Sequence, residues 1–230
     1  MSLTRLSART DYVDEVYKTL LDAISDGTLP PGSRVKQEDI AEQLNVSRSP
    51  VLQALRLLKK DGLLEEAPGR GLVVVRLDPV RIGHLYHVRG ALDALAARLA
   101  AERRAELPQA LIAAGRAAAA GTDVKAMIDA DEAFHHAIYE ASGNPLIIES
   151  ASLHWIHLRR VMGAVLQQGA SRASVWDEHE GIRNAIRQGQ PEEAATLSHR
   201  HTELARTSLL ASLEQSLQPP PLQPPPLLAA

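Results

Sequence analysis

The sequence predicts a mainly α-helical protein, with an N-terminal winged helix-turn-helix and a C-terminal all-α antiparallel helical bundle. Three observations support this fold class. Residues 39–63 have the apolar spacing of two short helices joined by a tight turn. Two short β-prone runs around a Pro/Gly turn follow directly. Beyond residue 78 the composition becomes rich in Ala and Leu, and no further strand pattern appears.

The first expected helix covers residues 10–26, where apolar residues recur at helical spacing before Gly27. The β-prone runs at 63–66 and 72–75 flank the turn at 67–71 and predict a hairpin. A helix, a helix-turn-helix and a trailing hairpin together make a winged helix, a fold that binds DNA.

Within the helix-turn-helix, Asn45 lies where the chain must turn, and Asn tolerates left-handed backbone conformations. Ser47 is suited to cap the second helix, and Pro50 falls in its first turn, where a missing N–H costs nothing. The apolar residues at i, i+4 and i+7 then predict a buried stripe of Val51, Leu55 and Leu58.

The opposite face of the second helix is polar and carries Ser49, Gln53, Arg56 and Lys60. A major groove admits one α-helix, and such side chains reach base edges or phosphates there. Arg70, at the tip of the expected hairpin, could reach a neighbouring phosphate or the minor groove. The alternative is a solvated helical hairpin whose cations bind nothing.

Composition narrows the class of protein. The chain has 230 residues, a net charge of −3 and no cysteine, which excludes disulfides and thiolate metal sites. Residues 1–77 hold as many Asp and Glu as Lys and Arg, so any DNA affinity must come from local placement. Without an apolar run of membrane length or a signal peptide, we expect a soluble, cytoplasmic, nucleoid-associated bacterial protein with no membrane partner.

The expected domains are a DNA-binding winged helix at 1–77, a helical effector-binding and dimerisation domain at 78–213, and a disordered Pro-rich tail at 214–230. Gly, Asn and Pro breaks divide the second domain into expected helices at 79–105, 107–120, 122–142, 144–168, 172–188 and 191–213. Six helices with short connections favour an antiparallel bundle.

Several segments, in order, resemble the GntR family of bacterial transcription regulators, in its FadR-type branch with a helical FCD effector domain. They are AISDGTLPPGSRV, DIAEQLNVSRSPVLQALRLLKKDGLLEEAPGRG, VRGALDALAARLAA, DEAFHHAIYEASGNPLI, EHEGI and HRHTEL. The resemblance implies a winged helix that binds DNA as a homodimer and a bundle that binds a small effector. By the same resemblance Arg48 and Ser49 contact DNA, with Arg56 nearer the backbone.

The recognition helix departs from the family at one place. Leu52-Gln53 stands where the family commonly has an Arg-Glu pair, so the operator sequence does not carry over. Leu52 lies about 100° around the helix from Val51, at the edge of the buried stripe, where it could simply pack.

A possible metal site lies in the second half. Asp131 and His135 are four residues apart and share one helix face, and His179 and His201 follow on later helices. Three imidazoles and a carboxylate can meet inside a bundle, and they suit Zn²⁺, Ni²⁺, Mn²⁺ or Fe²⁺, with Zn²⁺ expected as purified. The resemblance implies the same four ligands. His136 and His199 point elsewhere and are expected to face solvent or an adjacent helix.

An effector carboxylate could occupy the open positions of such a metal. Arg89, which matches a pocket arginine of the family, could clamp it; the alternative is a helix-surface Arg paired with Asp93. Asn144 is a weaker candidate, because its position before a proline suits a helix cap. Arg159 or Arg160 could also face the cavity.

The sequence thus predicts a transcription regulator, most simply a repressor, that reads a pseudo-palindromic operator and responds to a small carboxylate metabolite. Three alternatives remain open. The metal ion itself could be the signal, the metal could activate water in a hydrolase, or the bundle could serve only dimerisation.

Overall fold

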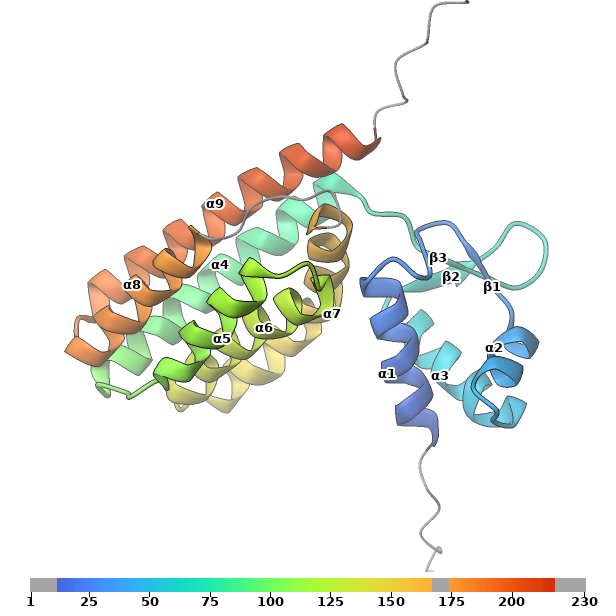
Figure 1. Ribbon diagram of the computed structural model, residues 1–230, viewed down its shortest axis with the longest axis horizontal. Helices are drawn as coiled ribbons and strands as arrows, with labels where there is room; N and C mark the ends of the chain where they lie inside the picture. Colours follow the sequence, from blue (N-terminus) through green and yellow to red (C-terminus); the bar gives the residue numbers. More distant parts are fainter. Residues whose placement is uncertain (1–11, 167–173, 218–230) are drawn as a thin grey trace, which may run out of the picture.

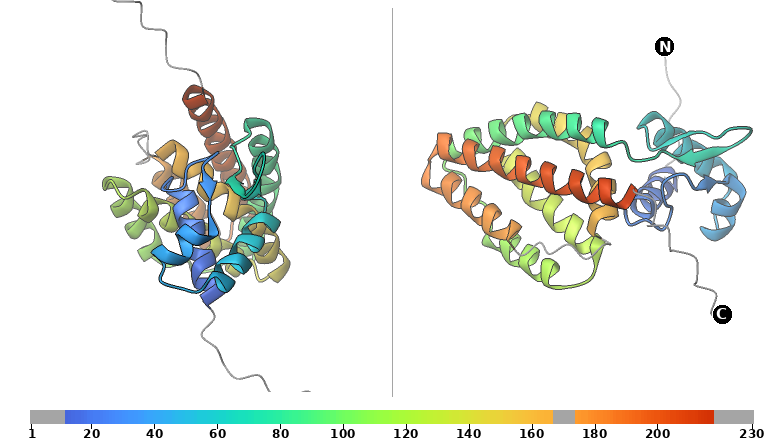
Figure 2. Two further views of the ribbon diagram at one scale, coloured as in Figure 1. Left: turned by 90° about the vertical axis from the view of Figure 1, so that its right-hand side faces the viewer. Right: turned by 90° about the horizontal axis from the view of Figure 1, so that it is seen from above.

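The computed structural model describes residues 12–166 and 174–217, so most of the expected Pro-rich tail lies outside the described residues. A small winged helix packs against one end of a longer helical bundle (Figure 1). In the other views the long helices run away from this contact, and the winged helix covers only the bundle's end (Figure 2). No helix in the described ranges is both long and apolar enough to cross a membrane.

The winged helix has a three-stranded antiparallel sheet in the order β1-β3-β2. Arg34 of β1 and Glu65 of β2 both pair with Val73 of the central strand. The strand β1 was not predicted, because two residues are too few to carry an alternating pattern. The elements are α1 (Tyr12–Ser25), β1 (Arg34–Val35), α2 (Gln37–Gln43), α3 (Arg48–Lys60), β2 (Leu64–Glu66) and β3 (Leu72–Val74).

The turn of the helix-turn-helix follows the sequence prediction. Asn45 has a φ of 51°, in the left-handed region. The expected stripe of Val51, Leu55 and Leu58 is buried against α1 and α2. Ser47 precedes α3 in an extended conformation, but its side chain accepts no capping hydrogen bond. Leu52, which the sequence allowed to pack at the edge of this stripe, is 39% exposed.

The bundle consists of α4 (Pro79–Glu102), α5 (Gln109–Ala120), α6 (Val124–Ala141), α7 (Pro145–Leu166), α8 (Val175–Gln188) and α9 (Pro191–Leu217). The two longest helices, α4 and α9, lie side by side and run in opposite directions (Figures 1 and 2). Asp78 begins α4 by accepting a hydrogen bond from the Val80 N–H at 2.9 Å. Phe134, Tyr139 and Ile182 are among the fully buried residues of the core.

The winged helix and the bundle meet where α1 crosses α7. A Cβ atom built on Gly163 would lie 1.7 Å from the carbonyl oxygen of Ser25, so the two backbones touch there. Neither Arg159 nor Arg160 lines the cavity beside the histidines, although the sequence allowed either to face it. Arg160 donates to the Val75 carbonyl, and Arg159 reaches Asp22 of α1 at 3.3 Å. Both arginines therefore join α7 to the winged helix.

Candidate metal centre and nucleic-acid interface

The structure brings together the four residues predicted as metal ligands. Asp131 and His135 lie on adjacent turns of α6, His179 comes from α8 and His201 from α9, and all four are buried. The Nε2 atoms of His179 and His201 are 3.2 Å apart. Asp131 Oδ1 lies 3.7 Å from His179 Nε2. Each histidine can offer a ring nitrogen so that the three nitrogens lie within 4.8 Å of one another.

The printed separation of the His179 and His201 nitrogens is compatible with a shared divalent ion. Two nitrogens 3.2 Å apart, each at the usual Zn–N length of about 2.1 Å, would subtend an angle of about 100° at the ion. The donor set of imidazole and carboxylate suits borderline divalent metals.

A carboxylate that the sequence analysis missed orients one of the rings. Glu178 Oε2 lies 2.8 Å from His201 Nδ1. When Nδ1 donates its proton to this carboxylate, the lone pair of Nε2 points toward His179, which is the orientation a ligand needs. Glu178 directly precedes His179 in the DEHEG segment, but nothing in that spacing reveals that its partner is on α9.

Arg89 is buried, so the alternative that placed it on the helix surface is wrong. The ion pair with Asp93 that this alternative included is nevertheless present. The Nε of Arg89 donates to Asp93 Oδ2 at 3.1 Å, and its guanidinium lies 4.8 Å from the ring centre of Trp155. Burial by itself lowers the pKa of Arg89, but Asp93 and nearby groups outweigh burial and raise it above its usual value. The second carboxylate oxygen of Asp93 accepts from the Tyr139 hydroxyl at 2.5 Å.

Arg89 also bonds to a predicted metal ligand. Its Nη2 lies 2.9 Å from His135 Nε2, and because Arg can only donate, the histidine nitrogen accepts. Burial, reinforced by the charge of Arg89, holds the pKa of His135 well below its usual value, so the ring is neutral at neutral pH. A metal ion bound at Nε2 would compete with Arg89 for the same lone pair.

A cavity of about 260 Å³ opens beside the histidines. Arg89, Asp131 and His201 border it together with apolar residues of α7 and α9. Asn144 is elsewhere: its Oδ1 accepts from the Leu146 N–H at 3.1 Å, as a cap at the start of α7. Trp176 is buried, and its ring centre lies 4.6 Å from that of His179.

The other histidines of α6 and α9 point away from this cluster. His136 Nδ1 lies 3.5 Å from Glu140, and its side chain is 39% exposed. His199 is exposed. Both follow the expectation from helix geometry, because neighbours one or two positions from a ligand face another direction.

The predicted DNA-contacting residues are all exposed. Ser49, Gln53 and Arg56 are exposed on α3, and Arg70 is exposed at the tip of the wing between β2 and β3. Arg48, at the first turn of α3, is 70% exposed and lies 3.5 Å from Glu38 of α2.

Arg34 was not singled out from the sequence. It donates to the carbonyls of Arg70 at 3.0 Å and Pro68 at 3.1 Å, which ties the wing to β1. No local pattern could have identified it, because its partners lie more than thirty residues away. Arg34 adds a cation beside Arg70 and limits the motion of the wing.

Comparisons with known proteins agree with this architecture. Residues 12–74 match the bacterial regulatory proteins of the gntR family, and residues 84–204 match the FCD domain. A regulator described as lying in an unstable DNA locus of Streptomyces ambofaciens is 29% identical over 204 residues, covering 86% of this chain and 85% of that protein. The probable D-xylose utilization operon transcriptional repressor of Paenarthrobacter nicotinovorans is 29% identical over 189 residues, covering 81% and 83%.

Among solved structures, Escherichia coli McbR/YncC superposes with a TM-score of 0.78 over 90% of this chain and 100% of that chain. Their sequences are 21% identical, so this likeness concerns the fold. The gntR match implies binding to operator DNA, and the FCD match implies a small-molecule effector. Both matched domains occur in transcription regulators, and the relatives named here are regulators. The alternative of a metal-dependent hydrolase is therefore set aside. The chain belongs to the GntR family of bacterial transcription regulators and carries a C-terminal FCD domain.

Proposed function

We propose that this regulator is a homodimeric repressor that holds a divalent metal ion at Asp131, His135, His179 and His201 and responds to a small organic acid. The observation that carries the proposal is the meeting of buried imidazoles and a buried carboxylate beside a cavity of about 260 Å³. A divalent ion there would supply a Lewis-acidic attachment point for an effector carboxylate.

The cavity supports an acidic effector. Its border includes Arg89, whose guanidinium can bind a carboxylate in a bidentate manner, while apolar residues of α7 and α9 would cover the rest of a small molecule. An effector bound there would touch α4 through Arg89 and α9 through His201. Because α4 follows the wing directly, movement of α4 is a route to the DNA-binding side.

On the DNA side, Arg48, Ser49, Gln53, Arg56 and Arg70 would contact the operator. Two winged helices related by a two-fold axis would read a pseudo-palindrome. Repression, as opposed to activation, is supported by the relative described as the repressor of a D-xylose utilization operon. In this proposal residues 1–77 form the DNA-binding domain, and residues 78–213 form the domain that binds the effector and mediates dimerisation.

Elemental analysis of the purified, dialysed chain tests the metal. We expect close to one divalent ion per chain in the wild type and in the control His136→Ala, whose side chain points away from the cluster. The double variant His135→Ala/His179→Ala should lose the ion. The metal assignment fails if the wild type carries none, or if the double variant retains it.

Fluorescence anisotropy on duplex DNA selected from a random library tests the response. Citrate, lactate and glucuronate serve as probe acids, and at least one should weaken DNA binding about tenfold or more in the metal-loaded wild type, a coupling of ordinary size. The organic-acid proposal fails if none of the three has an effect that depends on His179.

One observation favours a second candidate function, in which the ion itself is the signal. In the structure Arg89 bonds to His135 Nε2, so metal uptake at that atom would release a buried side chain of α4. Under this alternative, removing the metal with a chelator changes DNA binding in the absence of any acid. If the ion only completes the acid site, the chelator abolishes the acid response and leaves basal DNA binding unchanged.

A further inference from the structure

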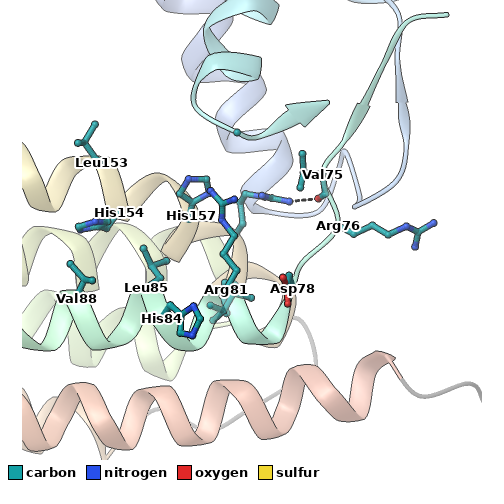
Figure 3. A pocket seen from close by; sticks show the side chains of 14 residues that line it. Val75, Arg76, Asp78, Arg81, His84, Leu85, Val88, Leu153, His154 and His157 are labelled. Atoms are coloured by element: carbon teal, nitrogen blue, oxygen red, sulfur yellow. Dashed lines mark hydrogen bonds between the residues drawn. The ribbon is translucent and has the colours of Figure 1, made fainter. Parts of the chain in front are cut away.

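A second cavity, of about 330 Å³, lies where the winged helix meets the bundle (Figure 3). It is separate from the histidine cluster and shares none of its residues. Residues of α4 and α7 form one wall, and Gly62 together with the chain after β3 closes the other side. The cavity therefore touches both halves of the protein.

The charge lining this cavity is strongly unbalanced. Arg81 and Arg160 contribute guanidinium groups, and His84, His154 and His157 contribute imidazoles. A Cβ atom built on Gly62 would lie 3.7 Å from the His157 ring and 3.8 Å from Arg81 Nη2, so these two groups converge on the same place. Arg76 is different: its side chain points away from the cavity and lies against Gly32.

Nearby carboxylates are already engaged. Asp78 is the one carboxylate among the described residues that line the cavity, and it caps α4 through the Val80 N–H. Asp61 acts on His157 from outside the lining, but it accepts the Tyr17 hydroxyl at 2.7 Å. Neither carboxylate forms an ion pair with Arg160.

Arg160 is the most informative residue of this site, because it is a buried cation with a neutral partner. It is 5% exposed, and its guanidinium donates a hydrogen bond to the Val75 carbonyl (Figure 3). Burial, and then the charge of Arg81, lower its pKa to about 10, so the guanidinium remains charged at neutral pH. A buried cation is normally balanced by an opposite charge, and a bound anion would provide it.

The remaining lining is apolar. Leu85 and Val161 line the cavity, and so do Val88 and Leu153, which lie at the end away from Arg81 in the close view (Figure 3). A ligand that fills this cavity therefore needs an acidic group at the Arg81 and Arg160 end and a hydrophobic body at the other. Inorganic phosphate meets only the first requirement.

We propose that the cavity between α4, α7 and the chain after β3 binds a small amphipathic monoanion, a carboxylate with an apolar body, held by Arg81, Arg160 and His157. This site is independent of the metal site and lies at the joint between the DNA-binding and effector domains. Its occupant would fasten the chain after β3 to α4 and α7.

Thermal unfolding of the full chain with benzoate, and with benzamide as a neutral molecule of the same shape, tests the proposal. Benzoate in tenfold excess over its dissociation constant should raise Tm by about 4 °C, and benzamide should not. Arg81→Gln and Arg160→Met should lose the benzoate response. Arg98→Gln, which lies on the same helix outside the cavity, should keep it.

Three results would overturn the proposal: no benzoate shift in the wild type, an equal shift with benzamide, or a benzoate shift that persists in both Arg81→Gln and Arg160→Met. A phosphate shift equal to that of benzoate would overturn the amphipathic part. Since Arg81 is exposed and lies outside the histidine cluster, Arg81→Gln should retain its fold and its metal content. Elemental analysis of this variant separates a failure here from a failure of the metal proposal.

Discussion

Adding one methyl group at Gly163 should separate the winged helix from the bundle. The Cβ of Gly163→Ala would lie 1.7 Å from the Ser25 carbonyl oxygen and 2.9 Å from its carbon. Both groups are backbone, so no side chain can rotate away, and α1 must shift relative to α7. The nearby contacts of Arg159 with Asp22 and of Arg160 with Val75 would be strained by the same movement.

Gly181 offers a matched control within another helix. A Cβ there meets only Leu197 Cδ1 at 3.9 Å, an ordinary contact. Replacing a helical glycine by alanine normally stabilises by up to about 1 kcal/mol, whereas overpacking costs about 1–3 kcal/mol. Both glycines lie within helices, so the helix gain is common to the two variants and only the overpacking separates them. We therefore expect Gly181→Ala to be more stable than Gly163→Ala by about 1–3 kcal/mol, which corresponds to about 3–9 °C in Tm.

Differential scanning calorimetry measures this difference, and limited proteolysis after residue 75 reports whether the domains have separated. Gly163→Ala should be cleaved faster than either the wild type or Gly181→Ala. Equal Tm values and equal cleavage rates for the two variants would refute the account of the α1–α7 contact.

Three further predictions concern other contacts. Arg159→Met removes the cation that pairs with Asp22, Asp129 and Glu132. Because these carboxylates are partly exposed, we expect the free energy of unfolding, measured in urea, to fall by about 1–3 kcal/mol, and the difference from the wild type to shrink at high salt. Burial, together with the hydrogen bond to Asp61, raises the pKa of Tyr17 above its usual value. The folded chain thus keeps a proton that the unfolded chain releases, so this stabilisation is complete below about pH 10 and declines above it. Urea titrations at about pH 9 and about pH 11 should show a smaller pH-dependent loss in Tyr17→Phe, and an equal loss would contradict this linkage. Gly115→Ala would place a Cβ 1.9 Å from the ring of Trp176, and that ring packs on His179. We expect this variant to shift the tryptophan fluorescence and to retain less metal in dialysis. Unchanged fluorescence and unchanged metal content would count against this packing.

The local sequence determined those features that depend on a few consecutive residues. Asn45 occupies the left-handed turn and Val51 is buried because the helical period and the turn geometry are properties of short segments. The Ala- and Leu-rich second half became helices for the same reason, with ends within a few residues of the expected breaks. The spacing of Asp131 and His135 likewise fixed that they share one face of α6.

Contacts between distant segments were decided only by the tertiary structure. Periodicity fixes the direction of a side chain around its helix, but not which neighbouring helix covers it. Thus Arg89 is buried against Trp155, and Leu52 is exposed, although the sequence allowed the opposite for each. Arg160 faces the winged helix instead of the histidine cavity, because the packing of the winged helix on the bundle brings the Val75 carbonyl within its reach. The meeting of His179 with His201 depends in the same way on the packing of α8 against α9, which no spacing along the chain encodes.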